Sequence, residues 1–242
     1  MKIVMVNLKV LLLDTDYYAL QAINSYLAWD RRTRVTAMVE SIDEMWKYIN
    51  RTPLAELPDV VVLDADHMGG AAALRASIER LRQKIHNVMV ICLAQFAEPA
   101  LIEAAVDAGA RGYLLKSEVR LQIAWAIVFA LDHPFVVTNA IARAGESIFN
   151  HRLLQPTALP PRREYPELTE RIRQAIELCV VKGMPAHLAA DEMGISLHTI
   201  RSYIKEGYRI LEAYDETEYP VDMSPQERAF MRLTGFDENA EE

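Results

Sequence analysis

The chain has 242 residues, and its 51% apolar and 25% charged side chains exclude a disordered chain and a fibrous repeat. The net charge of −8 excludes a uniformly basic nucleic-acid binder, yet the acidity is concentrated in residues 215–242, which carry nine acidic and two basic side chains. Residues 162–214 are balanced, with eight of each sign. This length predicts one large domain or two modest ones.

The cysteines and the N-terminus bear on where the protein resides. Cys92 and Cys179 lie far apart in apolar stretches and in no metal-ligand spacing, so we expect buried, reduced thiols. The apolar N-terminus is interrupted by Asn7 and Lys9, with no cleavage site after it. No apolar run reaches the roughly 20 residues of a membrane span. We therefore expect a cytoplasmic protein with no membrane partner.

The first 131 residues alternate short apolar runs with segments of helical periodicity. The predicted strands are Val10–Leu13, Arg34–Val39, Asp59–Leu63, Val88–Leu93 and Gly112–Leu115. The predicted helices are Tyr17–Ala28, Ile42–Ile49, Ala71–Ile85, Pro99–Ala108 and Val119–Leu131. Strands that alternate with helices of this length indicate a parallel sheet covered by helices. We therefore predict a doubly wound α/β domain with a five-stranded parallel sheet over residues 1–132.

Residues 133–166 lose this alternation. His133 and Pro134 end the last helix, and Thr138–Ile148 could form one more helix. Four prolines then fall within residues 155–167. This composition is typical of an extended, semi-stiff linker, so we place the domain boundary here.

Residues 167–214 show a wholly helical pattern, which predicts an all-α second domain. The predicted helices are Leu168–Val181, Pro185–Met193 and one that is capped by Ser196 and runs through Leu211. Ala190 is a small residue that lets two helices cross closely, and Gly194 suits a left-handed turn. Ile200 supplies an apolar contact back to the first helix, so the spacing predicts a helix-turn-helix.

Residues 215–242 form an acidic tail with one clear helical signal. Ser224, Pro225 and Glu227 supply a capping serine, a proline at the first helical position and a reciprocal glutamate. The short helix that they begin should stop at Gly235. We expect a solvated terminus, with packing of this helix on the second domain or on a partner as the alternative.

The carboxyl ends of the predicted strands carry the candidate chemistry of the first domain, because parallel strands bring their last residues to one edge of the sheet. Asp14, Asp64 and Lys116 end the first, third and fifth strands, and Ala94 ends the fourth. Two carboxylates and a lysine suit phosphoryl transfer. One carboxylate accepts the phosphoryl group, the other helps to hold Mg²⁺, and the lysine contacts the phosphoryl oxygens.

Residues 10–131 resemble the receiver domain of bacterial two-component response regulators. The segments that carry the resemblance are Leu11–Asp14, Pro58–Asp64 and Ala108–Lys116. It implies that Asp64 is the candidate phospho-acceptor and Lys116 the lysine that binds the phosphoryl group. It also implies that Tyr113 is the aromatic residue that moves when such domains switch.

The sequence departs from the family at the residues that would hold a metal ion. Receivers usually carry two adjacent acidic residues after the first strand, but here Thr15 follows Asp14 and the next carboxylate, Asp16, comes one position late. The candidate metal ligands are Asp14, Asp64 and Asp66. We expect them to hold Mg²⁺ weakly or not at all, because affinity depends on ligand charge, and we expect no cofactor to be required.

A second departure concerns the switch. Ala94 stands where the family has a serine or threonine whose hydroxyl binds the phosphoryl group and draws the aromatic residue inward. Without that hydroxyl, we expect Tyr113 to be held inward permanently. A buried tyrosine needs a partner for its hydroxyl, and we expect a backbone carbonyl of residues 95–98. We interpret His67, near the same edge, as a solvated loop side chain.

Residues 168–211 are similar to the four-helix DNA-binding domain of the NarL/LuxR regulators. The residues at the recurring positions of that module are Gly183, Ala190, Gly194, Ser196, Thr199, Ile200, Arg201 and Leu211. Gly207 departs from it by falling within a helix, where glycine costs about 1 kcal/mol relative to alanine. The resemblance implies that Leu197–Leu211 enters the major groove of double-stranded DNA. The candidate DNA contacts are His198, Thr199, Arg201, Ser202, Lys205 and Arg209.

Together these observations predict a sequence-specific DNA-binding transcription regulator, not an enzyme, with a degenerate receiver that works without phosphorylation. We expect a homodimer that forms without a phosphodonor through Pro99–Ala108 and Val119–Leu131, with Trp125 or Phe129 left exposed for the partner. Two alternatives stay open. One is a conventional response regulator that a histidine kinase switches through Asp64, and the other is an interaction adaptor that has lost DNA binding.

Overall fold

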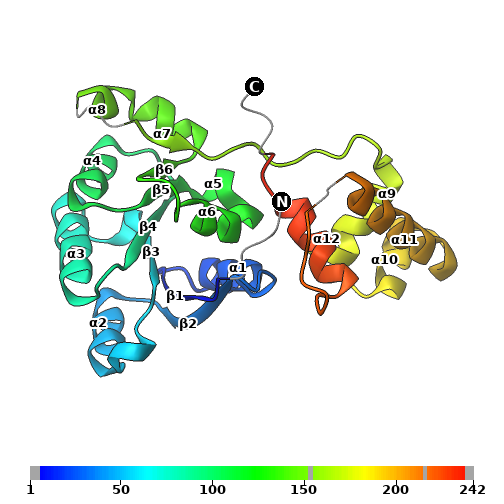
Figure 1. The fold of residues 1–242 in the computed structure, drawn as a ribbon, viewed down its shortest axis with the longest axis horizontal. Helices are drawn as coiled ribbons and strands as arrows, with labels where there is room; N and C mark the ends of the chain where they lie inside the picture. The colour runs from blue at the N-terminus through cyan, green and yellow to red at the C-terminus, as the bar shows by residue number, and fades with distance from the viewer. Residues whose placement is uncertain (1–5, 152–154, 215–216, 238–242) are drawn as a thin grey trace. The chain divides into compact units, whose positions relative to one another are not determined.

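The computed structural model describes residues 6–151, 155–214 and 217–237. The chain divides between Pro160 and Pro161 into two compact units, which we call the sheet unit and the helical unit (Figure 1). No helix in the described part of the chain combines the length and the apolar character that crossing a bilayer requires.

The sheet unit is built on seven parallel strands in the order β2-β1-β3-β4-β5-β6-β7 (Figure 1). The strands are β1 (Leu8–Leu13), β2 (Thr33–Val39), β3 (Val60–Asp64), β4 (Met89–Ala94), β5 (Gly112–Leu115), β6 (Val136–Val137) and β7 (Thr157–Ala158). Every residue of β3, β4 and β5 is buried, as expected for strands whose apolar runs are continuous because helices cover both faces.

Helices cover the sheet on both sides. On one side α1 (Tyr17–Ala28) packs against α6 (Ile123–Phe129). The other helices of this unit are α2 (Ile42–Arg51), α3 (Ala71–Lys84), α4 (Pro99–Ala108), α5 (Lys116–Val119), α7 (Asn139–Ala144) and α8 (Glu146–His151), with short turns η1 (Leu54–Glu56), η2 (Ala65–His67) and η3 (Arg120–Gln122). Buried residues of α2, α3, α4, α7 and α8 share one core with alternate residues of the strands.

The segment expected to be a linker belongs largely to the sheet unit, so the five-stranded prediction is wrong. β6 and β7 extend the sheet beyond β5 to seven strands. The helix expected over Thr138–Ile148 is two helices, α7 and α8, separated at Gly145. Ile141 and Phe149 anchor these helices in the main core. Strands of two residues are too short to show a hydrophobic period, which is why composition alone indicated a linker.

This extension lies beside β5 and α5. β6 pairs with the outer edge of β5, where Gly112 is opposite Val136. α7 packs on β5, and the amide of Ala140 donates a hydrogen bond to Glu118 Oε2 of α5 at 3.2 Å. The outer edge of β5 is therefore paired within the chain.

The fifth predicted helix, Val119–Leu131, is interrupted. α5 ends before Arg120, which has a φ of 38°, a conformation that is uncommon for a residue with a side chain, and α6 begins only after η3. Neither aromatic residue expected to be left for a partner is free. The guanidinium of Arg32 lies 4.0 Å from the centre of the Trp125 ring, and Phe129 stacks on a neighbouring histidine.

The helical unit contains the predicted helix-turn-helix. Its helices are α9 (Glu170–Ile176), the π-helical turn η4 (Glu177–Val181), α10 (Ala186–Met193), α11 (Leu197–Tyr214) and α12 (Pro225–Thr234). Gly194 ends α10 with a φ of 64°, and Ser196 Oγ accepts a hydrogen bond from the amide of Thr199 at 3.0 Å at the start of α11. A Cβ on Gly207 would lie 2.6 Å from Ile176 Cγ1, so glycine allows α11 to approach α9 closely.

The tail helix is an integral part of the helical unit, so the expected solvated terminus is wrong and the packed alternative is confirmed. α12 packs against α11 and η4, and the predicted capping box at its start is present. Tyr165 Oη donates a hydrogen bond to the carbonyl of Arg232 at 2.9 Å, and Arg162 Nε donates one to the carbonyl of Leu233 at 2.6 Å. The backbones of Arg162 and Phe236 also pair in an isolated antiparallel β-bridge. The acidic composition of the tail hid the apolar residues of α12, which are buried in this unit.

Candidate functional site

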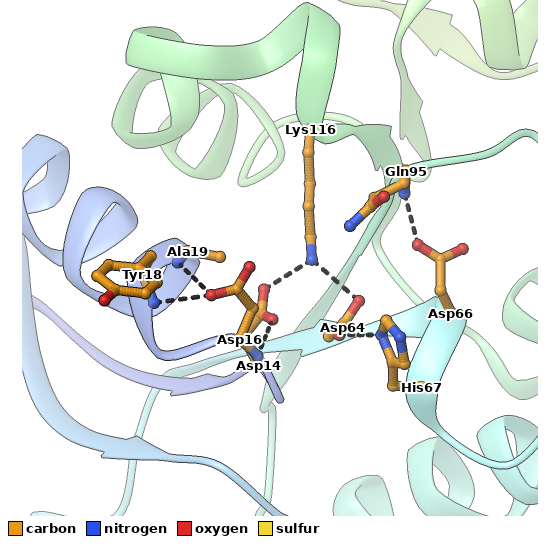
Figure 2. Close-up of polar contacts among 9 residues, drawn as sticks. All are labelled: Asp14, Asp16, Tyr18, Ala19, Asp64, Asp66, His67, Gln95 and Lys116. Atoms are coloured by element: carbon orange, nitrogen blue, oxygen red, sulfur yellow. Dashed lines mark hydrogen bonds and ion pairs between the residues drawn. The ribbon is translucent and has the colours of Figure 1, made fainter.

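The structure brings Asp14, Asp64 and Lys116 together at the carboxyl edge of the sheet (Figure 2). Asp14 directly follows β1, Asp64 ends β3, and Lys116 directly follows β5. Lys116 Nζ lies 2.7 Å from Asp14 Oδ2 and 3.0 Å from Asp64 Oδ1. Both aspartates are buried, with 2% and 1% of their surface exposed. One cation therefore joins the ends of three strands.

Burial and pairing have opposing effects on these charges. Burial is the largest influence on Asp14 and raises its pKa, although hydrogen bonds from Lys116 and from the amide of Asp16 act to lower it. Burial alone would lower the pKa of Lys116, but its hydrogen bonds with Asp14 and Asp64 and their charges outweigh burial and raise that pKa. Lys116 is therefore charged at neutral pH and serves as the counter-ion that the two carboxylates share.

His67 is a further member of this edge, and interpreting it as a solvated side chain misses its contact. Its Nδ1 lies 2.6 Å from Asp64 Oδ2, while about half of its side chain is exposed. An ionised carboxylate only accepts hydrogen bonds, so we assign the proton of this bond to Nδ1. The contact arises because residues three apart eclipse each other along a tight 3₁₀ turn such as η2.

The remaining nearby carboxylates turn away from Asp64. Asp16 Oδ1 accepts hydrogen bonds from the amides of Tyr18 at 2.8 Å and Ala19 at 3.3 Å, which caps α1. Asp66 Oδ2 accepts one from the amide of Gln95 at 2.5 Å, and Figure 2 shows it directed away from Lys116. Among the side chains that the structure describes, no cluster of three or more His, Cys, Asp or Glu residues is placed to hold a metal ion. The residues present do not fit Mg²⁺, which needs several oxygen ligands in octahedral geometry.

Tyr113 is fully buried, which confirms its predicted inward position. Its ring lies in the same core as Ala94 and the buried face of α4. The predicted partner for its hydroxyl is wrong, because within the described residues Tyr113 Oη has no hydrogen-bond partner. Burial raises the pKa of Tyr113, and it raises the pKa of Cys92, the opposite residue on β4, to about 12. Both side chains are therefore neutral at physiological pH.

We expect Tyr113→Phe to leave the free energy of unfolding unchanged or to raise it by up to about 1–3 kcal/mol. A buried hydroxyl without a partner loses its hydrogen bonds to water on folding and gains none in the protein. Urea unfolding measures the difference. Tyr165→Phe is the matched control, since Tyr165 is equally buried but its hydroxyl donates a hydrogen bond, so about 0.5–1.5 kcal/mol should be lost. A Tyr113→Phe variant less stable than the parent would show that the hydroxyl has a partner.

The candidate DNA contacts lie along α11. His198, Arg201, Ser202, Lys205 and Arg209 are exposed. The sixth candidate, Thr199, is half-buried, and its hydroxyl bonds that of Ser196 at 2.8 Å.

Arg209 differs from the other candidates because it has a partner on its own helix. Its guanidinium bonds Glu206 at 2.6 and 3.0 Å, which raises the pKa of Arg209 and lowers that of Glu206. Arg201 and Lys205 are the other exposed cations among the candidates on this helix.

Comparison with known proteins places these observations in a family. The family described as "Response regulator receiver domain" matches residues 10–127. The transcriptional activator protein ExaE of Pseudomonas putida is 29% identical over 158 residues, which cover 62% of this chain and 66% of that protein. The transcriptional regulatory protein DesR of Bacillus subtilis is 29% identical over 161 residues, with coverages of 66% and 70%. The chain thus spans about two thirds of the length of these relatives.

Longer matches extend the similarity beyond the receiver. The response regulator protein VraR of Staphylococcus aureus is 26% identical over 217 residues, which cover 88% of this chain and 94% of that protein. RcsB of Salmonella enterica serovar Typhimurium, solved bound to a promoter, shares the fold with a TM-score of 0.51 at 16% identity, over 95% of this chain and all of that one. Residues 10–127 therefore form a response regulator receiver domain, and over most of its length the chain is similar to response regulators such as VraR.

Proposed function

We propose that this protein is a sequence-specific DNA-binding transcription regulator whose receiver domain is degenerate and works without phosphorylation. The observation that carries the proposal is the closed edge around Asp64. One oxygen of Asp64 bonds Lys116 and the other bonds His67. Phosphoryl transfer to this carboxylate would need a free oxygen and a divalent cation to neutralise charge. Here both oxygens of Asp64 are hydrogen-bonded, and the nearby residues that the structure describes do not form a site for the cation. The contacts of Lys116 with Asp14 and Asp64 instead stabilise the packing of the three strand ends.

The output function rests on the helical unit. α11 follows the left-handed turn at Gly194 and presents exposed polar and basic side chains from its first turns, as a recognition helix does. ExaE and DesR are named as transcriptional regulators, and the RcsB structure was solved on a promoter, which supports the same role here. The balanced charge of residues 162–214 implies weak, salt-sensitive non-specific binding, so specificity depends on a few contacts.

We expect Arg201→Ala and Lys205→Ala each to weaken binding of the full chain to its operator, selected from genomic fragments, without unfolding the protein. Arg201 should also relax base preference by about 1–3 kcal/mol at one base pair, the range for a bidentate contact. Lys205 should weaken all sequences alike and reduce the salt dependence by about one counterion, as a phosphate contact does. Fluorescence anisotropy across salt concentrations measures both effects.

Arg209→Ala is the matched control for these variants, because Arg209 lies on the same helix but is already paired with Glu206. Its affinity should stay within a few-fold of the parent. Equal losses in all three variants, or none in any, would remove the assigned face of α11 from the interface.

We expect a homodimer in the absence of any phosphodonor, because two half-sites must add to give useful affinity from a weakly charged module. A solved RcsB structure is described as two dimers bound to two DNAs, which supports this expectation. Because β6 pairs with the outer edge of β5, the contact should not use that edge of the strand. Light scattering at micromolar concentration tests it, and a monomer at every salt concentration would contradict it.

Intact mass after incubation with Mg²⁺ and acetyl phosphate tests the receiver proposal. We expect no added phosphoryl group on the parent. The alternative of a conventional phosphorylation switch is favoured by the retained contact between Asp64 and Lys116. It predicts a mass increase in the parent that Asp64→Asn abolishes.

A further inference from the structure

His67 completes the enclosure of Asp64. The side chain of Asp64 has no exposed surface, and its two oxygens are divided between two donors, Lys116 Nζ at 3.0 Å and His67 Nδ1 at 2.6 Å. The shorter of these contacts is the one made by the histidine. A metal ion that coordinates Asp64 Oδ2 would have to displace the His67 ring (Figure 2).

The backbone on both sides of His67 is tied down, so the ring is held against Asp64 by its surroundings. The preceding residue, Asp66, bonds the amide of Gln95 across the edge. The following residue, Met68, is buried in the core with 1% of its surface exposed. The 3₁₀ turn between these anchors places His67 three residues after Asp64, on the same side of the turn.

The oxygens of Asp64 have hydrogen-bond partners at this edge without a metal. Two buried carboxylates lie beside one lysine, and a buried carboxylate is tolerated only when its oxygens are paired and hydrogen-bonded. We propose that the His67 ring and Lys116 together occupy the place of a divalent cation. Two features then exclude Mg²⁺: Thr15 supplies no carboxylate, and His67 blocks Asp64. This inference rests on the proposed function and names the side chain that closes the site.

The inference predicts a result that is not additive. If Thr15 were the whole reason for poor Mg²⁺ binding, Thr15→Asp would restore it alone. If His67 also blocks the site, Thr15→Asp and His67→Ala will each have little effect, and the double variant will bind. His67→Gln offers an amide donor to the same oxygen, so Thr15→Asp combined with His67→Gln should remain closed. His86→Ala is the control, because His86 is exposed and precedes β4, at the opposite edge of the sheet.

Isothermal titration calorimetry of MgCl₂ into the full chain measures these affinities, with far-UV circular dichroism to confirm folding. We expect the double variant to bind Mg²⁺ at least tenfold more tightly than Thr15→Asp alone, and the His86→Ala background to match the parent background. Thr15→Asp combined with His67→Ser repeats the test if the alanine variant does not fold. Two results overturn the inference. One is equal Mg²⁺ binding by Thr15→Asp with His67 present and with His67 replaced by alanine or serine. The other is no Mg²⁺ binding when Thr15→Asp is combined with His67→Ala or with His67→Ser.

The two proposals fail in different ways. Tight Mg²⁺ binding and phosphorylation of the parent protein would overturn the proposed function. A parent that does not bind, together with full recovery by Thr15→Asp alone, would leave the proposed function standing and remove only the role of His67.

Discussion

Replacing Lys116 with methionine should lower the free energy of unfolding of the sheet unit by about 3–5 kcal/mol, the loss typical when one partner of a buried ion pair is removed. Asp14 and Asp64 would then be two buried carboxylates without their shared cation. Methionine keeps most of the aliphatic length of lysine, so packing changes little. Urea unfolding followed by tryptophan fluorescence reports this unit, because Trp29, Trp46 and Trp125 all lie in it.

Two variants make this result specific. Lys47→Met removes an exposed lysine of α2 and should change stability by no more than about 0.5 kcal/mol. Adding Asp14→Asn to Lys116→Met should recover part of the loss, because it removes one of the two buried carboxylates that Lys116 contacts. A Lys116→Met variant as stable as the Lys47→Met control would contradict the shared counter-ion.

The raised pKa of Lys116 gives the same contact a pH dependence. Its folded pKa lies above the ordinary value of 10.5, so the stability that it contributes is fully present below pH 10.5 and is lost as pH rises through the higher folded value. Above neutral pH, the difference in unfolding free energy between the parent and Lys116→Met should therefore stay constant up to about pH 10 and then shrink.

Replacing Phe230 with alanine should lower the free energy of unfolding by about 3–5 kcal/mol, the usual range for removing a buried phenylalanine. Phe230 is 1% exposed in α12, which packs on α11 and η4. Urea unfolding followed by far-UV circular dichroism measures the change. Val221→Ala lies just before the same helix but is 99% exposed, so it should be within about 0.5 kcal/mol of the parent. Equal stability of the two variants would mean that the tail is a solvated terminus after all.

The sequence predicts most of this fold because most of its elements are long enough to show a period. The strands from β1 to β5 contain short apolar runs, and Asp14, Asp64 and Lys116 follow or end three of them, so their meeting at one edge follows from parallel geometry. β6 and β7 have two residues each and leave no such signal. α12 was visible as a helix through its capping box, but the surrounding acidic residues concealed that it packs.

The parts of the site that the sequence did not predict depend on side-chain direction. Asp66 and His67 are neighbours, and only the conformation of η2 decides that the histidine, not the carboxylate, reaches Asp64. The hydroxyl of Tyr113 was expected to find an acceptor because buried hydroxyls usually do, and the packing around it supplies none among the described residues. Such outcomes are set by packing in three dimensions, which spacing along the chain does not encode.

The most direct test of the account is the affinity of the full chain for its operator before and after treatment with Mg²⁺ and acetyl phosphate, measured by fluorescence anisotropy on samples whose intact mass is recorded. A receiver closed by Lys116 and His67 predicts the same affinity, the same salt dependence and an unchanged mass in both samples. A gain of one phosphoryl group that Asp64→Asn abolishes, together with severalfold tighter binding, would contradict it.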